Sequence, residues 1–119
     1  MGASFFAPTV LVMERSKLRP SQHNYLELPT CFHDGVVVFG ARWCAPFVYL
    51  LHQFEPLEEP VFERLSFYDV DTPDGVRLAD IFGVKTLPTL LSFKNGVNLR
   101  RVTDPFNMAT IREELQNIT

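Results

Sequence analysis

The chain has 119 residues, of which 46% are hydrophobic and 21% are charged, so it fits one domain with a core of ordinary size. Its formal net charge of −3 offers no basic surface to a nucleic-acid backbone, which excludes nucleic acid as an expected partner. No apolar stretch approaches the roughly 18 residues of a membrane-spanning helix. The N-terminal segment lacks the basic start and the cleavage pattern of a secretory signal. We therefore expect an intracellular protein, in the cytosol or in an organelle such as the mitochondrion, with no membrane span.

The first third of the chain gives weak structural signals. Residues 8–13, PTVLVM, form a short apolar run rich in β-branched residues, which predicts a strand. Residues 14–24 are polar and contain proline, which predicts a loop. Residues 23–33 favour only a short, poorly specified helix, broken at Pro29.

The middle of the chain predicts strands alternating with helices. Residues 34–43, DGVVVFGARW, form an apolar run without alternation, which is typical of a central strand buried on both faces. Residues 44–56, CAPFVYLLHQFEP, have Pro46 in the first turn, where its missing N–H costs nothing, and then apolar residues at helical spacing. Residues 64–72 predict a further strand and residues 74–84 a short helix that ends at a glycine. The apolar residues of that short helix are Val76, Ala79, Ile81 and Phe82.

The last third predicts a hairpin and a helix. The turn Lys94-Asn95-Gly96 separates residues 87–93 from residues 97–103, and an Asn-Gly pair suits a type I′ turn between two strands. Asn107 is a suitable N-cap for a helix over residues 107–119. One face of that helix carries Met108, Ile111, Leu115 and Ile118.

The two cysteines are not expected to pair within one chain. A strand over residues 36–42 would hold Cys31 and Cys44 about 20 Å apart or more, whereas a disulfide needs Cα atoms within about 7 Å. Cys31 is therefore interpreted as a small, half-buried hydrophobic residue. His23, His33 and His52 have no ligand spacing, so no metal site is expected, and no cofactor is expected either.

The segment Arg42-Trp43-Cys44-Ala45-Pro46-Phe47 follows the central strand, TLPT follows at residues 86–89, and FKNG follows at residues 93–96. In this order the motifs resemble the thioredoxin family, over residues 34–118. The resemblance implies an α/β thioredoxin-like fold with a central mixed sheet flanked by helices. It also implies a single domain over residues 1–119, with a variable N-terminal part at residues 1–33, and a cis bond between Leu87 and Pro88.

The family's active site uses two cysteines, and this chain keeps one. In the W-C-x-x-C pattern the first thiolate, at a helix N-terminus, attacks a substrate disulfide, and the second cysteine resolves the mixed disulfide. Cys44 has the first position, but Phe47 has the second. The family's buried Asp corresponds to Val38 and its Lys partner to Phe67, while a Trp of the strand–helix turn becomes Gly40. The resemblance therefore implies that dithiol turnover is absent.

Two functions remain open at this point. The first is a redox-inactive or redox-regulated module, such as a holdase chaperone or an adaptor, that binds protein or peptide clients through backbone hydrogen bonds. The second is a monothiol oxidoreductase in which Cys44 is catalytic and an external thiol such as glutathione resolves the mixed disulfide. Oxidation could also link two chains through Cys44. The residues expected to line the peptide-binding groove are Trp43, Ala45, Pro46, Phe47, Leu87 and Pro88.

Exposure of three of these side chains is a further expectation. Trp43, Phe47 and Leu87 are expected to leave an apolar surface beside Cys44, as an interaction site would. The competing interpretation of Phe47 is that its ring packs into the core between helix and sheet.

Overall fold

The structure, a computed structural model, describes residues 28–119. The expected strand at 8–13, the expected loop at 14–24 and the first part of the expected helix at 23–33 lie outside the described residues. Within them, the end of that helix is a single 3-10 turn, η2 (Thr30–Phe32).

A mixed four-stranded sheet forms the centre of the fold, as expected. The strands lie in the order β2-β1-β3-β4. The central strand β1 runs parallel to β2 and antiparallel to β3, and β4 pairs antiparallel with β3. Their bounds are β1 (Gly35–Gly40), β2 (Leu65–Asp69), β3 (Thr89–Lys94) and β4 (Val97–Val102). All six residues of β1 are buried, which agrees with its unbroken apolar sequence.

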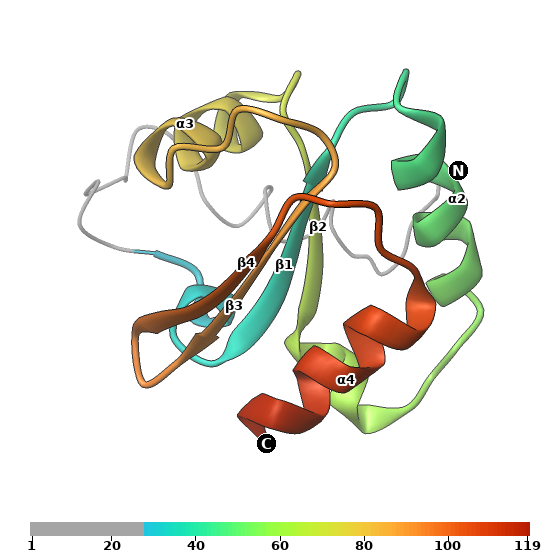
Figure 1. The fold of residues 1–119 in the computed structure, drawn as a ribbon, viewed down its shortest axis with the longest axis vertical. Helices are drawn as coiled ribbons and strands as arrows, with labels where there is room; N and C mark the ends of the chain where they lie inside the picture. Colours follow the sequence, from blue (N-terminus) through green and yellow to red (C-terminus); the bar gives the residue numbers. More distant parts are fainter. Residues whose placement is uncertain (1–27) are drawn as a thin grey trace.

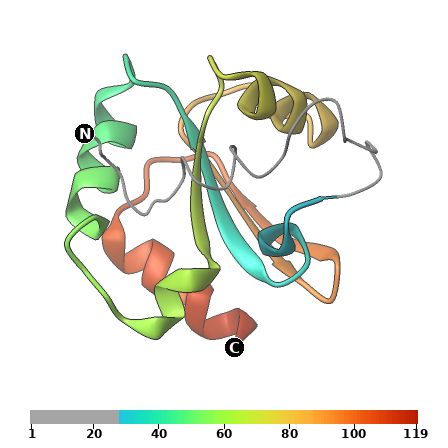
Figure 2. The ribbon, with the colours of Figure 1, turned by 180° about the vertical axis from the view of Figure 1, so that it is seen from behind.

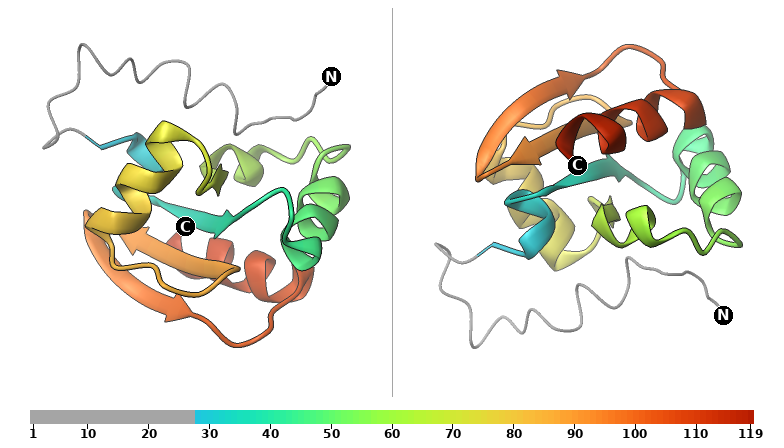
Figure 3. Two further views of the ribbon diagram at one scale, coloured as in Figure 1. Left: turned by 90° about the horizontal axis from the view of Figure 1, so that it is seen from above. Right: turned by 90° about the horizontal axis from the view of Figure 1, so that it is seen from below.

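Helices cover both faces of the sheet (Figure 1). Helices α2 (Ala45–Phe54) and α4 (Met108–Ile118) pack on one face, and we call the buried cluster beneath them the α2/α4 core. Helix α3 (Pro73–Ile81) and the η2 turn pack on the other face, over what we call the α3 core. Figure 3 shows α3 and α4 on opposite sides of β1. The 3-10 turn η3 (Pro60–Arg64) leads into β2, which faces the viewer in Figure 2.

The turns and caps follow their sequence signals. Asn95 and Gly96 have φ angles of 54° and 79°, as a type I′ turn between β3 and β4 requires. Gly83 has a φ of 64° just after α3, the left-handed conformation that ends many helices. Asn107 caps α4, because its side-chain oxygen accepts a hydrogen bond from the backbone N–H of Thr110 at 3.1 Å.

In the part of the chain that the structure describes, no helix has the length and apolar character needed to cross a bilayer.

Candidate functional site

Cys44 lies at the start of α2, where the sequence places it. It is the N-cap residue of the helix, and Pro46 occupies the first turn. Its backbone N–H donates to the carbonyl oxygen of Ala41 at 2.9 Å, and its own carbonyl oxygen accepts from Val48 at 3.1 Å. The residue is only 8% exposed. Cys44 thus stands at a helix N-terminus, a position whose N–H groups in general favour a negative charge, although its side chain makes no capping hydrogen bond.

Trp43 projects into solvent beside Cys44. Its side chain is 71% exposed, an unusual position for the chain's single tryptophan. The indole N–H donates a hydrogen bond to Oδ2 of Asp71 at 2.8 Å. Asp71 follows β2, so the loop between β2 and α3 sets the orientation of the tryptophan.

A second acid, the last residue of β2, contacts the residue before Trp43. Oδ2 of Asp69 lies 3.4 Å from Nε of Arg42. Oδ1 of Asp69 accepts a hydrogen bond from the backbone N–H of Asp71 at 2.8 Å. Two consecutive residues of the loop before α2, Arg42 and Trp43, are thus in contact with two carboxylates, one from the last residue of β2 and one from the loop that follows it.

Phe47, at the position of the missing second cysteine, points into the core. It is 4% exposed, and its ring packs against Phe67 with 5.7 Å between centroids and an angle of 67° between planes. The expectation that its ring forms part of an exposed apolar surface is therefore wrong. The physical reason is the neighbouring Gly40, because the space that a side chain at position 40 would take is filled by the Phe47 ring.

The other apolar replacements adjoin this ring. Val38 lies opposite Phe67 in the parallel ladder of β1 and β2, and both belong with Phe47 to the α2/α4 core. No ionisable side chain occupies any of these three positions. The core beneath the start of α2 is therefore apolar. By the resemblance, a dithiol thioredoxin has a buried Asp, a proton acceptor, at the position of Val38.

The proline loop lies where the resemblance implies. The Leu87-Pro88 bond is cis, as predicted. Leu87 is half-buried and packs against both the α2/α4 core and the α3 core, so it contributes less exposed apolar area than expected. The segment between α3 and β3 also contacts β4 at its start, because the guanidinium of Arg101 donates hydrogen bonds to the carbonyl oxygens of Phe82 and Gly83.

The two cysteines lie in different cores. Cys44 belongs to the α2/α4 core and Cys31 to the α3 core, on opposite faces of the sheet, and both are thiols. This agrees with the prediction that they do not pair. Among residues 28–119, no group of three or more His, Cys, Asp or Glu side chains is arranged to hold a metal ion.

The sequence model of the thioredoxin family matches residues 23–117. The chain belongs to the thioredoxin family. The family and the fold expected from the resemblance are thereby confirmed, whereas the peptide-binding role of the groove residues stays a prediction.

Individual thioredoxins are distant relatives of this chain. A thioredoxin of Malassezia sympodialis is 35% identical over 72 residues, which cover 58% of this chain and 69% of that protein. A chloroplastic M-type thioredoxin of Pisum sativum is 27% identical over 81 residues, which cover 68% of this chain but only 47% of the pea protein. The matched part of this chain thus spans less than half of some relatives.

Solved structures agree on the fold. The thioredoxin of Fasciola hepatica superposes with a TM-score of 0.58 at 24% identity, over 74% of this chain and 85% of that one. The Malassezia sympodialis thioredoxin gives a TM-score of 0.55 at 24% identity, over 75% and 81%. At these identities the likeness concerns the fold alone.

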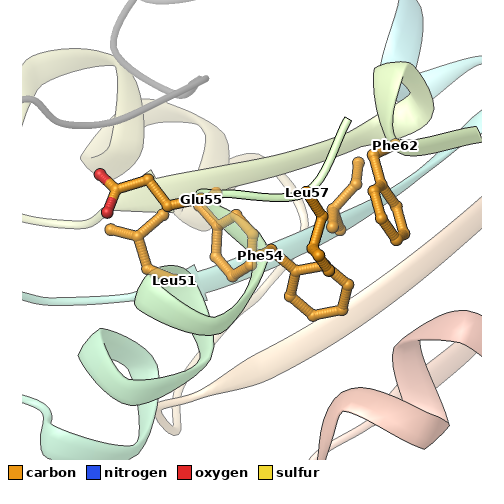
Figure 4. Close-up of a pocket in the computed structure, with 7 residues that line it drawn as sticks. Leu51, Phe54, Glu55, Leu57 and Phe62 are labelled. Atoms are coloured by element: carbon orange, nitrogen blue, oxygen red, sulfur yellow. The ribbon is translucent and has the colours of Figure 1, made fainter. Parts of the chain in front are cut away.

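A small cavity lies at the opposite end of α2 from Cys44. Its volume is about 50 Å³, and its wall is apolar except for Glu55. Figure 4 shows the side chains of Leu51, Phe54, Leu57 and Phe62 gathered there. The space is partly open to solvent. It lies away from Cys44 and is not part of the thioredoxin-like site.

The motifs of the sequence do not single out Arg42 and Asp69 as site residues. The sequence predicts a strand over residues 64–72, whereas β2 ends at Asp69. A signal for the pair is present in the sequence. Asp69 and Asp71 stand at the end of β2, and Arg42 and Trp43 follow β1, the neighbouring parallel strand.

Proposed function

We propose that this member of the thioredoxin family binds extended or unfolded protein segments, as a holdase chaperone or an adaptor does, and does not catalyse dithiol exchange. One observation carries the proposal: Phe47 takes the place of the resolving cysteine and is packed into the core, while Trp43 beside it is 71% exposed. Position 47 thus contributes to folding rather than to chemistry.

The chain offers no substitute for the missing thiol. Resolution of a mixed disulfide on Cys44 requires a second thiolate within reach of its sulfur. The remaining cysteine, Cys31, lies in the core on the other face of the sheet. The placement of the two cysteines in different cores supports the proposal that no intramolecular second step takes place.

The exposed surface suits a binding role. Trp43, Ala45 and Pro46 are exposed around the start of α2, and Leu87 and Pro88 are half-buried. An exposed tryptophan supplies a large contact area at a small cost in conformational entropy, which is why Trp is common at interaction sites. A client segment would lie across Trp43 and along the Leu87-Pro88 loop, held in part by backbone hydrogen bonds.

The test is the suppression of aggregation of a heat-denatured client, followed by light scattering under reducing conditions. We expect Trp43→Ala to weaken suppression and Cys44→Ser to leave it largely intact. Tyr49→Ala is the matched control, because Tyr49 is also an exposed aromatic residue of this region, 67% exposed, but lies outside the proposed groove. If Trp43→Ala and Tyr49→Ala behave alike, the groove does not carry the activity.

A second candidate, a monothiol oxidoreductase, is favoured by the position of Cys44 at the N-cap of α2. In this reaction the Cys44 thiolate attacks the glutathione sulfur of a glutathionylated substrate, which forms a disulfide between Cys44 and glutathione and releases the substrate thiolate. A glutathione thiolate then attacks the glutathionylated Cys44, which releases oxidised glutathione and restores the Cys44 thiolate. Turnover of a glutathionylated substrate that is lost in Cys44→Ser, with binding of clients lost as well, would replace the binding proposal with this one.

A further inference from the structure

We infer that Asp69 is the positioning residue of the Trp43 surface: it holds Asp71 and Arg42, and through them it fixes the indole beside Cys44. The role of this surface in client binding rests on the proposed function, but the effect of Asp69 on the order of the indole can be tested without a client. Asp69 itself touches neither the expected client nor the thiol.

The hydrogen bond of Trp43 needs support from a second residue. Its acceptor, Asp71, is exposed, and an isolated hydrogen bond between exposed groups adds little order because water competes for both partners. Asp71 orders the indole only if its own backbone is fixed. Asp69 supports that backbone, because the Asp71 N–H donates a hydrogen bond to Oδ1 of Asp69 at 2.8 Å.

Asp69 is well placed for this task. It is the last residue of β2 and is only 8% exposed, so its carboxylate is fixed by the sheet rather than by solvent. Its backbone carbonyl also accepts hydrogen bonds from the Thr72 hydroxyl at 2.6 Å and from the Thr72 N–H at 3.0 Å. The hydroxyl of Thr72 in turn accepts from Gly75 and caps α3. The loop that carries Asp71 is therefore held at both of its ends by Asp69 and Thr72.

The second oxygen of Asp69 holds the other loop. Oδ2 lies 3.4 Å from Nε of Arg42, whose side chain is 86% exposed. A mostly exposed ion pair contributes little to stability. Here it restrains Arg42, the residue that directly precedes Trp43. The backbone of Trp43 is thus restrained through Arg42, and its indole is restrained by the hydrogen bond to Asp71. Both restraints converge on one nearly buried carboxylate.

This arrangement makes a specific energetic prediction about coupling. If Asp69 acts on Trp43 through Asp71, the two acids form one unit, and their substitutions are not additive. Asp69→Ala should release the indole, and Asp71→Ala should release it directly. In the Asp71→Ala background, Asp69→Ala should release it further only by the part that acts through Arg42, which is less than its effect in the native chain.

Intrinsic fluorescence measures the effect directly, because Trp43 is the chain's single tryptophan. We expect Asp69→Ala to lower the steady-state anisotropy of Trp43 and to raise its quenching by acrylamide, with far-UV circular dichroism unchanged. Asp69→Asn keeps an acceptor for the Asp71 N–H but loses the charge that holds Arg42, and should fall between Asp69→Ala and the native chain. Asp80→Ala, an exposed acid of α3, is the matched control.

Client affinity is the second readout. Loss of a single ordering hydrogen bond corresponds to about a twofold to tenfold weakening, and we expect Asp69→Ala to weaken client binding within that range. A lower unfolding midpoint in Asp69→Ala with native anisotropy, native quenching and native affinity would assign Asp69 a purely structural role and overturn the inference. If the fluorescence changes as expected but the native chain binds no client, the positioning role stands and the proposed function fails.

Discussion

The ring of Phe47 fills the space that a side chain at Gly40 would need. A Cβ atom at position 40 would lie 2.0 Å from Cδ1 of Phe47 and 2.5 Å from its Cβ, far closer than two carbon atoms can approach. The thioredoxin family, by the resemblance, has a Trp at the first of these positions and a Cys at the second. In this chain a large side chain has moved from the strand to the helix, so the two departures are one packing change.

This relationship predicts a non-additive pair of substitutions. Gly40→Ala should destabilise the fold by about 1–3 kcal/mol through overpacking. Phe47→Ala should cost about 3–5 kcal/mol through the cavity that it leaves. The double variant should be more stable than the sum implies, by about 1 kcal/mol, because each change relieves the other.

Urea unfolding of the four proteins measures this coupling. The control pair is Gly40→Ala with Leu91→Ala, since Leu91 lies in the α3 core on the other face of the sheet. That pair should be additive within about 0.5 kcal/mol. Additive behaviour of the Gly40 and Phe47 substitutions would show that the ring can move away at no cost, contrary to the close packing described above.

The sequence predicted the parts of the fold that local patterns determine. The apolar run of β1 has no alternation because both faces of this strand are covered, and the caps and turns at Asn95, Gly83 and Asn107 follow from their own conformational preferences. The buried face of α4 was also predicted, with Ile111, Leu115 and Ile118 inward. In each case the information lies within a few consecutive residues.

Close contacts between elements that are distant in the sequence could not be predicted from local patterns. Of the apolar residues that the sequence places on α3, Val76 and Ile81 are exposed, whereas the buried residues of the helix include Leu78, Ala79 and Gly75. Gly75 decides the orientation, since a Cβ there would lie 1.9 Å from the carbonyl oxygen of Asp69. Only glycine allows α3 to approach β2 so closely, and a helical periodicity does not record that approach.

A buried acid in α4 makes a second prediction about stability. Glu114 is 2% exposed and its Oε2 lies 3.6 Å from Nη2 of Arg100 on β4, while its Oε1 has no hydrogen-bond partner among the described residues. The carboxylate is buried while the Arg100 side chain is more than half exposed, so their attraction recovers little of the cost of removing the carboxylate from water. Glu114→Leu should therefore leave the free energy of unfolding unchanged or raise it by about 1 kcal/mol.

Removal of the cation should act in the opposite direction. Arg100→Ala leaves the buried carboxylate without its partner and should lower the free energy of unfolding by about 1–3 kcal/mol. Arg64→Ala, at an exposed arginine in η3, should change it by less than about 0.5 kcal/mol in the same urea titration. If Glu114→Leu is strongly destabilising, the ion pair is a net source of stability after all.

The cavity at the end of α2 makes a third prediction. Leu57 is half-buried and lines this space of about 50 Å³ together with Phe54 and Phe62. At about 24 cal/mol per Å³, the value for an enclosed cavity, filling this partly open space is worth at most about 1 kcal/mol. Leu57→Phe should raise the thermal midpoint by an amount of that order, whereas Leu99→Phe, on the exposed face of β4, should not. A lower midpoint for Leu57→Phe would mean that the walls cannot accept the larger ring.

The last prediction concerns the two thiols, which are nearly equally buried. Cys44 is 8% exposed and Cys31 is 6% exposed, so exposure alone does not decide which reacts first. Cys44 is the N-cap of α2, next to exposed residues on both sides, and a helix N-terminus favours the reactive thiolate. Cys31 belongs to the α3 core, and a reagent reaches it only after local opening of that core. We therefore expect iodoacetamide at neutral pH to alkylate Cys44 first, as peptide mapping by mass spectrometry would show.

Oxidation should also take place at Cys44 rather than at Cys31. Diamide takes two electrons and two protons from a pair of thiols, and we expect the disulfide-linked dimer that results to join two chains through Cys44. The dimer should persist in Cys31→Ser and disappear in Cys44→Ser on a non-reducing gel. It should also form more slowly than alkylation by a small reagent, because a second protein chain must approach a sulfur that is nearly buried. Labelling of Cys31 first, or a dimer that survives Cys44→Ser, would show that core opening and not the helix N-terminus controls thiol chemistry in this chain.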